Sequence, residues 1–194
     1  MWERTLNVSS IAKTMSCTGY KIGWVYGPAN LVNAAGLAHQ FVSYAVVTPL
    51  QEAVAVAIEQ GMSNGYWDQM RQRYVERRAL LLDALRKSGF HPIVPQGTFF
   101  VVCDVSGELK RLPPTWGTRD NETITKQFFD LRDWNFCRWM TTEVGVTAIP
   151  CSAFYAGPAS ARPQNIVRFA FCKKDNELVD AAHRLAKIEQ LLPK

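Results

Sequence analysis

The chain has 194 residues, of which 47% are hydrophobic and 20% are charged, a balance that excludes a disordered chain and suits one large domain or two small ones. The formal net charge of +5 permits attraction to anions, from phosphorylated cofactors to nucleic acid, without distinguishing among them. Five scattered cysteines without a Cys-x-x-Cys pair, and no apolar run of roughly 18 residues, argue against a disulfide framework, a structural zinc site and a membrane segment.

The first part of the chain predicts two short strands followed by helices. In chain order, the predicted elements are strands at 6–8 and 20–26, a helical region at 29–61 and an amphipathic helix at 66–88. Pro49 interrupts the helical region and suits the first turn of a second helix. Gly89 follows the amphipathic helix, where a glycine commonly ends a helix.

The second part alternates short strands, loops and helices. The predicted elements are a strand at 98–104, a surface loop at 106–121, a helix at 122–144, a strand at 146–149, a loop at 156–165, a strand at 166–172 and a helix at 176–192. Asp175 is the expected N-cap of the last helix. This alternation predicts an α/β or α+β layered fold rather than a bundle or a sandwich.

Two lysines lie close together near the N-terminus, in the sequence SSIAKTMSCTGYKIGW that begins at Ser9. Hydroxyl groups and unhindered backbone N–H groups around Lys13 suit a phosphate, and Lys21 adds a positive charge. An amine that forms a Schiff base is activated by a neighbouring cation. On these residues alone, a solvated loop lysine and an edge-strand lysine that maintains solubility are the commoner interpretation.

The string S-x-x-K-T-x-S-x-T-G-x-K-x-G-W resembles the lysine segment of fold-type I pyridoxal-phosphate aminotransferases, in the subgroup of kynurenine aminotransferases or cysteine-conjugate β-lyases. The resemblance continues through PQGTFFVVCDVS, GVTAIPCSAFY and VRFAFCKKDNELVDAAHRL. It implies an α/β protein in which residues 1–61 form the end of the large pyridoxal-phosphate domain. Residues 62–194 would form the complete small α+β domain, with helices packed on a small, mainly antiparallel sheet.

The same resemblance implies roles for individual residues. Lys13 matches the lysine that holds pyridoxal 5'-phosphate and carries the proton between the substrate Cα and the cofactor. Ser10 and Lys21 match the residues that bind the cofactor phosphate, and Arg168 matches the arginine that binds the substrate carboxylate. Tyr44 matches an aromatic residue that reaches the site of a neighbouring subunit. The implied assembly is therefore a homodimer or another homo-oligomer.

The implied reaction transfers an amino group from an L-amino acid to a 2-oxo acid, in the cytoplasm or the mitochondria. In the family, the aspartate, asparagine and tyrosine that hold the cofactor ring precede the lysine segment by more residues than this chain contains before Lys13. We therefore expect the chain alone to be inactive or nearly so. The alternative is a non-catalytic fragment or assembly module that needs a separate N-terminal portion to cover its strand edges and apolar face.

Two other functions are disfavoured by the residues themselves. The arginines between 71 and 78 lie on an ordinary amphipathic helix without interleaved aromatic residues, which argues against nucleic-acid binding. His39, His91 and His183 are far apart in the sequence and predict no metal site. We expect neither a nucleic acid nor a membrane as a partner.

Overall fold

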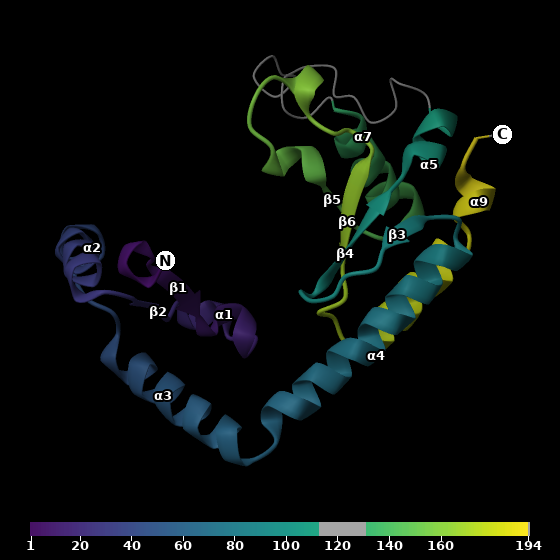
Figure 1. The fold of residues 1–194 in the computed structure, drawn as a ribbon. Helices are drawn as coiled ribbons and strands as arrows, with labels where there is room; N and C mark the ends of the chain where they lie inside the picture. Colours follow the sequence, from purple (N-terminus) through teal and green to yellow (C-terminus); the bar gives the residue numbers. More distant parts are fainter. Residues whose placement is uncertain (113–130, 194) are drawn as a thin grey trace. The chain divides into compact units, whose positions relative to one another are not determined.

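The computed structural model describes residues 1–112 and 131–193 (Figure 1). The chain divides into two compact units, residues 1–69 and residues 70–194, which are described separately below. The domain boundary that we predicted, between residues 61 and 62, precedes the boundary between the two compact units. It concerns the domains of the family and stays a prediction. No helix in the described residues is long and apolar enough to cross a bilayer.

Unit 1, residues 1–69, is built from two antiparallel strands and two main helices. Its elements are η1 (Trp2–Arg4), β1 (Asn7–Ser10), α1 (Ile11–Thr14), η2 (Thr18–Tyr20), β2 (Gly23–Tyr26), α2 (Ala29–Val42) and α3 (Thr48–Ser63). The interruption at Pro49 is confirmed, because this proline lies in the first turn of α3. The second strand starts later than predicted, because Thr18–Tyr20 forms a 3-10 turn and Lys21 is left-handed, with φ of 57°.

The core of unit 1 is small. Ile11, Ile22 and Val54 are buried together, and the Ile11 N–H donates to the Ile22 carbonyl at 3.2 Å. This contact joins the segment that carries Lys13 to the start of β2 and to helix α3. Many apolar side chains of the unit remain exposed, among them Val8, Trp24, Leu37, Phe41, Val42 and Tyr44. Exposed apolar side chains thus occur on both strands, on α2 and in the segment after it.

Unit 2, residues 70–194, packs helices on a four-stranded sheet. Its elements are most of α4 (Tyr66–Lys87), β3 (His91–Ile93), β4 (Phe100–Asp104), α5 (Ser106–Arg111), α7 (Arg132–Trp139), the π-helical η3 (Met140–Val144), β5 (Ile149–Pro150), η4 (Cys151–Phe154), η5 (Ala159–Ala161), β6 (Ile166–Ala170), α8 (Asp175–Leu185) and α9 (Ile188–Leu191). The strand order is β3-β4-β6-β5 and every pair is antiparallel. The predicted fold class, helices on a small antiparallel sheet, is confirmed.

Alternation along the two central strands separates the faces of this sheet. Val101 and Cys103 of β4, and Val167 and Phe169 of β6, are buried in the core with the helices. Successive side chains of a strand point to opposite faces, so Arg168 lies on the other face of β6. The core thus fixes which side of the sheet carries this arginine.

Gly89 ends helix α4, as the sequence predicts. Its N–H donates to the Arg86 carbonyl at 3.1 Å, and the Phe90 N–H donates to the Leu85 carbonyl at 3.0 Å, which is the Schellman arrangement. Gly89 has a φ of 88°, a conformation that costs glycine little. The motif turns the chain toward β3, a strand that the sequence analysis missed.

Three predicted boundaries differ from the structure. The expected loop at 106–121 begins with helix α5, because the Asp104 carboxylate accepts hydrogen bonds from the Ser106 N–H and hydroxyl. Asp175 is the first residue of α8, whose N-cap is Lys174. The last predicted helix is divided into α8 and α9.

The helix predicted at 122–144 is described only in part. Residues 113–130 lie outside the described residues, whereas α7 and η3 cover most of the remainder. The strand predicted at 146–149 is shorter and later, because β5 comprises Ile149 and Pro150.

Candidate functional site

Lys13 lies on a single turn of helix that follows directly from strand β1. Ser10 is the last residue of β1 and the N-cap of α1, with an extended backbone. The Thr14 hydroxyl donates to the Ser10 carbonyl at 2.9 Å and closes this turn. Lys13 is in the last turn of α1 and its side chain is exposed.

The pairing of β1 with β2 brings Ser10 beside the segment of Lys21. Ser10 is paired with Gly23 in the antiparallel register. A Cβ atom at position 23 would lie 2.9 Å from the Ser9 carbonyl oxygen and 3.4 Å from the Ser10 Cβ, so glycine is needed for this close approach. Lys21 precedes the pair by two residues, and its left-handed backbone redirects the chain into β2.

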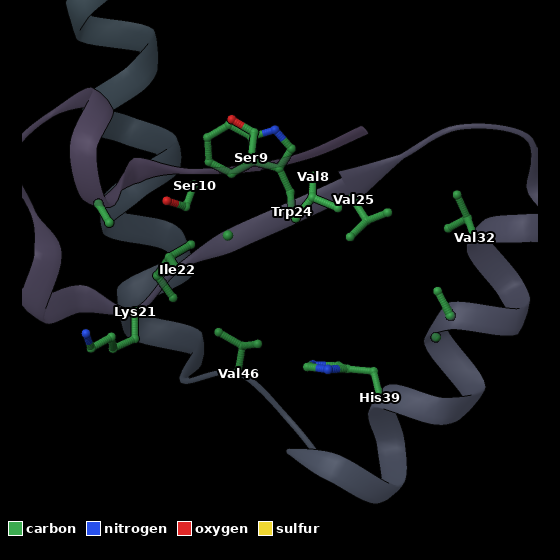
Figure 2. Close-up of a pocket in the computed structure, with 14 residues that line it drawn as sticks. Val8, Ser9, Ser10, Lys21, Ile22, Trp24, Val25, Val32, His39 and Val46 are labelled. Carbon is green, nitrogen blue, oxygen red and sulfur yellow. The ribbon is translucent and has the colours of Figure 1, made fainter. Parts of the chain in front are cut away.

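A cavity of about 750 Å³ lies in unit 1 and includes Ser10 and Lys21 in its wall. This volume falls within the range of roughly 300–1,000 Å³ that is typical of small-molecule sites. Figure 2 shows the Ser10 hydroxyl and the Lys21 ammonium on the same side of the close-up. The apolar part of the wall comprises Val8, Ile22, Trp24, Val25, Val32 and Val46.

The cavity also includes His39, a residue that the sequence analysis considered only as a metal ligand. Its ring extends from α2 toward Val46 (Figure 2), and its Nδ1 lies 3.3 Å from the Ser43 hydroxyl. The sequence predicts that His39 lies in a helix. It does not predict that this helix, α2, shares a cavity wall with strands β1 and β2. Within the described residues, no group of three or more His, Cys, Asp and Glu side chains is arranged to hold a metal ion.

The residues of this cavity fit a small phosphorylated ring compound. A hydroxyl and an ammonium group are suitable partners for a phosphate, and the apolar side chains offer surface to a planar ring. The structure therefore brings together Ser10 and Lys21, two of the residues assigned to the cofactor. It does not include Lys13 in the cavity wall, although this residue is on the turn that starts at Ser10.

Tyr44 lies apart from the cavity wall, in the connection between α2 and α3. Its side chain is 87% exposed and its backbone is left-handed, with φ of 61°. A non-glycine residue with positive φ is uncommon and marks a sharp change of chain direction. Within the described residues of unit 1 the ring is almost uncovered, and its contact with a neighbouring subunit stays a prediction.

Arg168 occupies the middle of the central strand β6 in unit 2. It is paired with Val102 of β4 on one side and with Ile149 of β5 on the other. The guanidinium is half-buried, and its Cζ lies 4.5 Å from the ring centre of Phe100 and 4.9 Å from that of Phe154. In residues 1–112 and 131–193, no carboxylate forms an ion pair with it.

A buried carboxyl group holds the turn that carries Phe154. Asp133 is fully buried, and its two oxygens accept hydrogen bonds from the Ser152 N–H at 2.8 Å and the Ser152 hydroxyl at 2.9 Å. Burial raises the pKa of Asp133, and the bonds from Ser152 oppose this rise. Burial also raises the pKa of the neighbouring Cys151 thiol, whereas the positive charge of Arg168 lowers it.

Comparison with known proteins identifies the class of protein that this fold and these residues define. The family model for aminotransferase class I and II matches residues 2–185. The chain belongs to this family. Within it, the chain groups with the kynurenine–oxoglutarate transaminases: it is 43% identical to the protein of that name from Dictyostelium discoideum over 191 residues, and 33% identical to human kynurenine–oxoglutarate transaminase 1 over 192 residues.

Solved structures agree with this assignment. The structure of Bna3p, a putative kynurenine aminotransferase from Saccharomyces cerevisiae, matches with a TM-score of 0.85 and 32% identity over 98% of this chain. YbdL from Escherichia coli, described with a methionine aminotransferase function, matches with a TM-score of 0.75 and 32% identity over 96% of this chain. Pyridoxal phosphate is the cofactor of the family.

The chain covers less than half of these proteins. It spans 43% of the Dictyostelium relative, 44% of the Bna3p chain and 42% of the YbdL chain. The chain therefore corresponds to one portion of these aminotransferases.

Proposed function

We propose that this chain forms the lysine-bearing and carboxylate-binding portion of a pyridoxal-phosphate-dependent aminotransferase of the kynurenine type. The enzyme transfers an amino group from an L-amino acid to a 2-oxo acid. The observation that carries the proposal is the shared cavity of Ser10 and Lys21, because it supplies a hydroxyl and a cation at one place beside the turn of Lys13.

Each residue has a separate task in this proposal. Ser10 and Lys21 bind the cofactor phosphate through a neutral and a charge-assisted hydrogen bond. When bound, the cofactor supplies an aldehyde that accepts amines and a ring that withdraws electrons from the substrate Cα. The Lys13 Nζ holds the cofactor and carries the proton that leaves the substrate Cα. Arg168 binds the substrate carboxylate in the plane of its guanidinium.

A covalent trapping experiment tests the role of Lys13. Purified 194-residue chain is incubated with pyridoxal phosphate, reduced with borohydride and digested, and the modified lysines are located by mass spectrometry. We expect Lys13 to be labelled at lower cofactor concentrations than the exposed Lys173, since Lys13 is on the turn that starts at Ser10 of the cavity wall, whereas Lys173 is not part of that wall. The Lys13→Ala variant should lose this labelling and keep the labelling of Lys173.

The comparison between the two lysines makes the result decisive. Labelling of Lys13 and Lys173 with the same concentration dependence would mean that the cofactor reacts with any accessible amine. This result would reject a cofactor site in the chain. Free phosphate should compete with labelling at Lys13 and leave labelling at Lys173 unchanged.

The second candidate function, an assembly module, is favoured by the exposed apolar side chains of unit 1. Phe41 is 91% exposed and Val42 is 83% exposed, beside the exposed Tyr44. Large groups of exposed apolar side chains commonly mark a surface that binds another protein chain. Sedimentation analysis should find a dimer that the double change Phe41→Asp and Tyr44→Asp dissociates, and a monomer at all concentrations would reject this assembly.

A further inference from the structure

Two aromatic rings from different elements lie against the guanidinium of Arg168. Phe100 is on β4, two residues from Val102, the strand partner of Arg168. It is therefore a diagonal neighbour on the same face of the sheet, a separation that an arginine and a phenylalanine bridge easily. Phe154 reaches the guanidinium from the turn η4, which follows β5.

The central carbon of the guanidinium lies over both rings. Cζ-to-centre distances of 4.5 Å and 4.9 Å are within the range in which a cation is attracted to an aromatic face. A guanidinium donates its hydrogen bonds in its own plane. A carboxylate therefore approaches the edge of the group, where it forms two parallel bonds.

Buried hydrogen bonds fix the turn that supplies the second ring. Phe154 itself is 59% exposed, so packing alone does not hold it in place. Ser152, two residues earlier, is fully buried and is bonded to Asp133 of α7 through both its N–H and its hydroxyl. The position of Phe154 is thereby connected to a rigid part of the core.

We propose that Phe100 and Phe154 are positioning residues that hold the Arg168 guanidinium edge-on for a planar carboxylate. The inference rests on the proposed function, in which Arg168 binds the carboxylate of an amino acid or a 2-oxo acid. It adds that the affinity for this carboxylate depends on the Phe154 ring, which lies against the Arg168 guanidinium.

Nuclear magnetic resonance of the full chain tests separately whether the rings stack on Arg168 and whether Arg168 binds a carboxylate. The Arg168 Nε–Hε signal, assigned by its loss in Arg168→Lys, reports ring stacking through its upfield shift and reports binding through its response to pyruvate. Pyruvamide, which lacks the carboxylate, is the matched ligand control. We expect Phe154→Leu to reduce the upfield shift and to weaken pyruvate binding about two- to five-fold, as expected for loss of one cation–π contact.

Two variants distinguish stacking from a general effect on the fold. Phe154→Tyr keeps an aromatic face and should restore both the upfield shift and the affinity. Tyr155→Leu removes the next aromatic residue, which is also exposed, and should change neither.

The outcomes separate this inference from the function on which it rests. If pyruvate shifts the Arg168 signal equally in the unchanged chain and in Phe154→Leu, the positioning role is wrong and the carboxylate role remains. If neither protein responds to pyruvate, Arg168 does not bind the carboxylate, and both are overturned.

Discussion

The Ser152 hydroxyl donates to the Asp133 carboxylate at 2.9 Å in a part of unit 2 where both side chains are fully buried. Ser152→Ala removes this donor and leaves the carboxylate oxygen incompletely bonded, with a hydrogen bond from the Trp134 N–H remaining. An incompletely bonded buried polar group costs about 1–3 kcal/mol, so we expect the free energy of unfolding to fall by this amount. Urea denaturation measures it, and Ser160→Ala, at an exposed serine, is the control. Equal losses in the two variants would contradict the role of this bond.

We expect the Glu108 carboxyl to lower the stability of unit 2 at neutral pH. It is buried, its Oε2 has no hydrogen-bond partner among the described residues, and burial raises its pKa above the ordinary value. A raised carboxyl pKa favours the folded state below the unfolded pKa, and this advantage is lost as the pH rises through the folded pKa. Glu108→Gln should therefore stabilise the protein at neutral pH, by roughly 1 kcal/mol.

The pH dependence of this effect distinguishes it from a change in packing. The stability difference between Glu108→Gln and the unchanged protein should grow in urea titrations as the pH rises above about 4, the ordinary pKa of a glutamate. Glu143→Gln, at an exposed glutamate, should show no such trend. A difference that stays constant over this range would mean that Glu108 does not change its charge there.

The C-terminus of α4 depends on a glycine. Gly89→Ala places a side chain at φ of 88°, which costs about 1–2 kcal/mol, whereas the new Cβ would be in ordinary contact 3.6 Å from the nearest Glu189 oxygen. We expect a corresponding loss of stability in thermal or urea unfolding. Gly107→Ala, in α5 and with no neighbouring atom within 4 Å, should be neutral or stabilising. Similar effects at both positions would contradict a conformational origin.

The cysteines of unit 2 differ in reactivity. Burial raises the pKa of the Cys103 thiol to about 12 and also raises that of Cys137, whereas Cys172 is exposed. The thiolate is the reactive form, so iodoacetamide should modify Cys172 in the folded protein and reach Cys103 and Cys137 only after denaturation. Mass spectrometry of digested protein measures this order. Rapid modification of Cys103 in the folded chain would show that the sheet opens.

Lys21 is suited to a test that removes its charge without disturbing the backbone. Its left-handed conformation is one that asparagine tolerates well, so Lys21→Asn should fold normally. Loss of a charge-assisted bond to phosphate should weaken pyridoxal-phosphate binding about ten-fold or more in an absorbance titration. Lys173→Asn, at an exposed lysine of unit 2, should bind as before. Equal pyridoxal-phosphate binding by both variants would mean that Lys21 is an ordinary surface lysine and does not bind the phosphate.

The sequence predicts the regular elements of this chain well where strong local signals agree. Pro49 and Gly89 mark helix ends that the structure confirms, because each residue restricts or permits a particular backbone conformation. The strand predicted at 166–172 is confirmed as β6 (Ile166–Ala170), and the structure adds that Arg168 lies on the face opposite Val167 and Phe169. Signals of this kind depend on a few adjacent residues and need no tertiary contact.

Other features have no distinctive pattern in the sequence. The helix after β4 forms because Asp104 bonds to Ser106, a local choice that polar, glycine-containing sequence does not distinguish from a loop. His39 reaches the cavity only because α2 packs near the strands, and Phe154 reaches Arg168 only because a turn folds back over β6. Neither relation has a periodic signal in the sequence.

The central position of β6 gives Arg168 a second consequence, for the fidelity of folding. A slip of one residue between β4 and β6 would turn Arg168 into the core and expose Phe169. An unpaired guanidinium in the core is far more costly than a misplaced apolar side chain, so the mispaired sheet is strongly disfavoured. Arg168, the residue assigned to substrate binding, thus also disfavours the wrong strand register. Replacing it with an apolar residue would remove this energetic penalty on the mispaired sheet as well as the anion site.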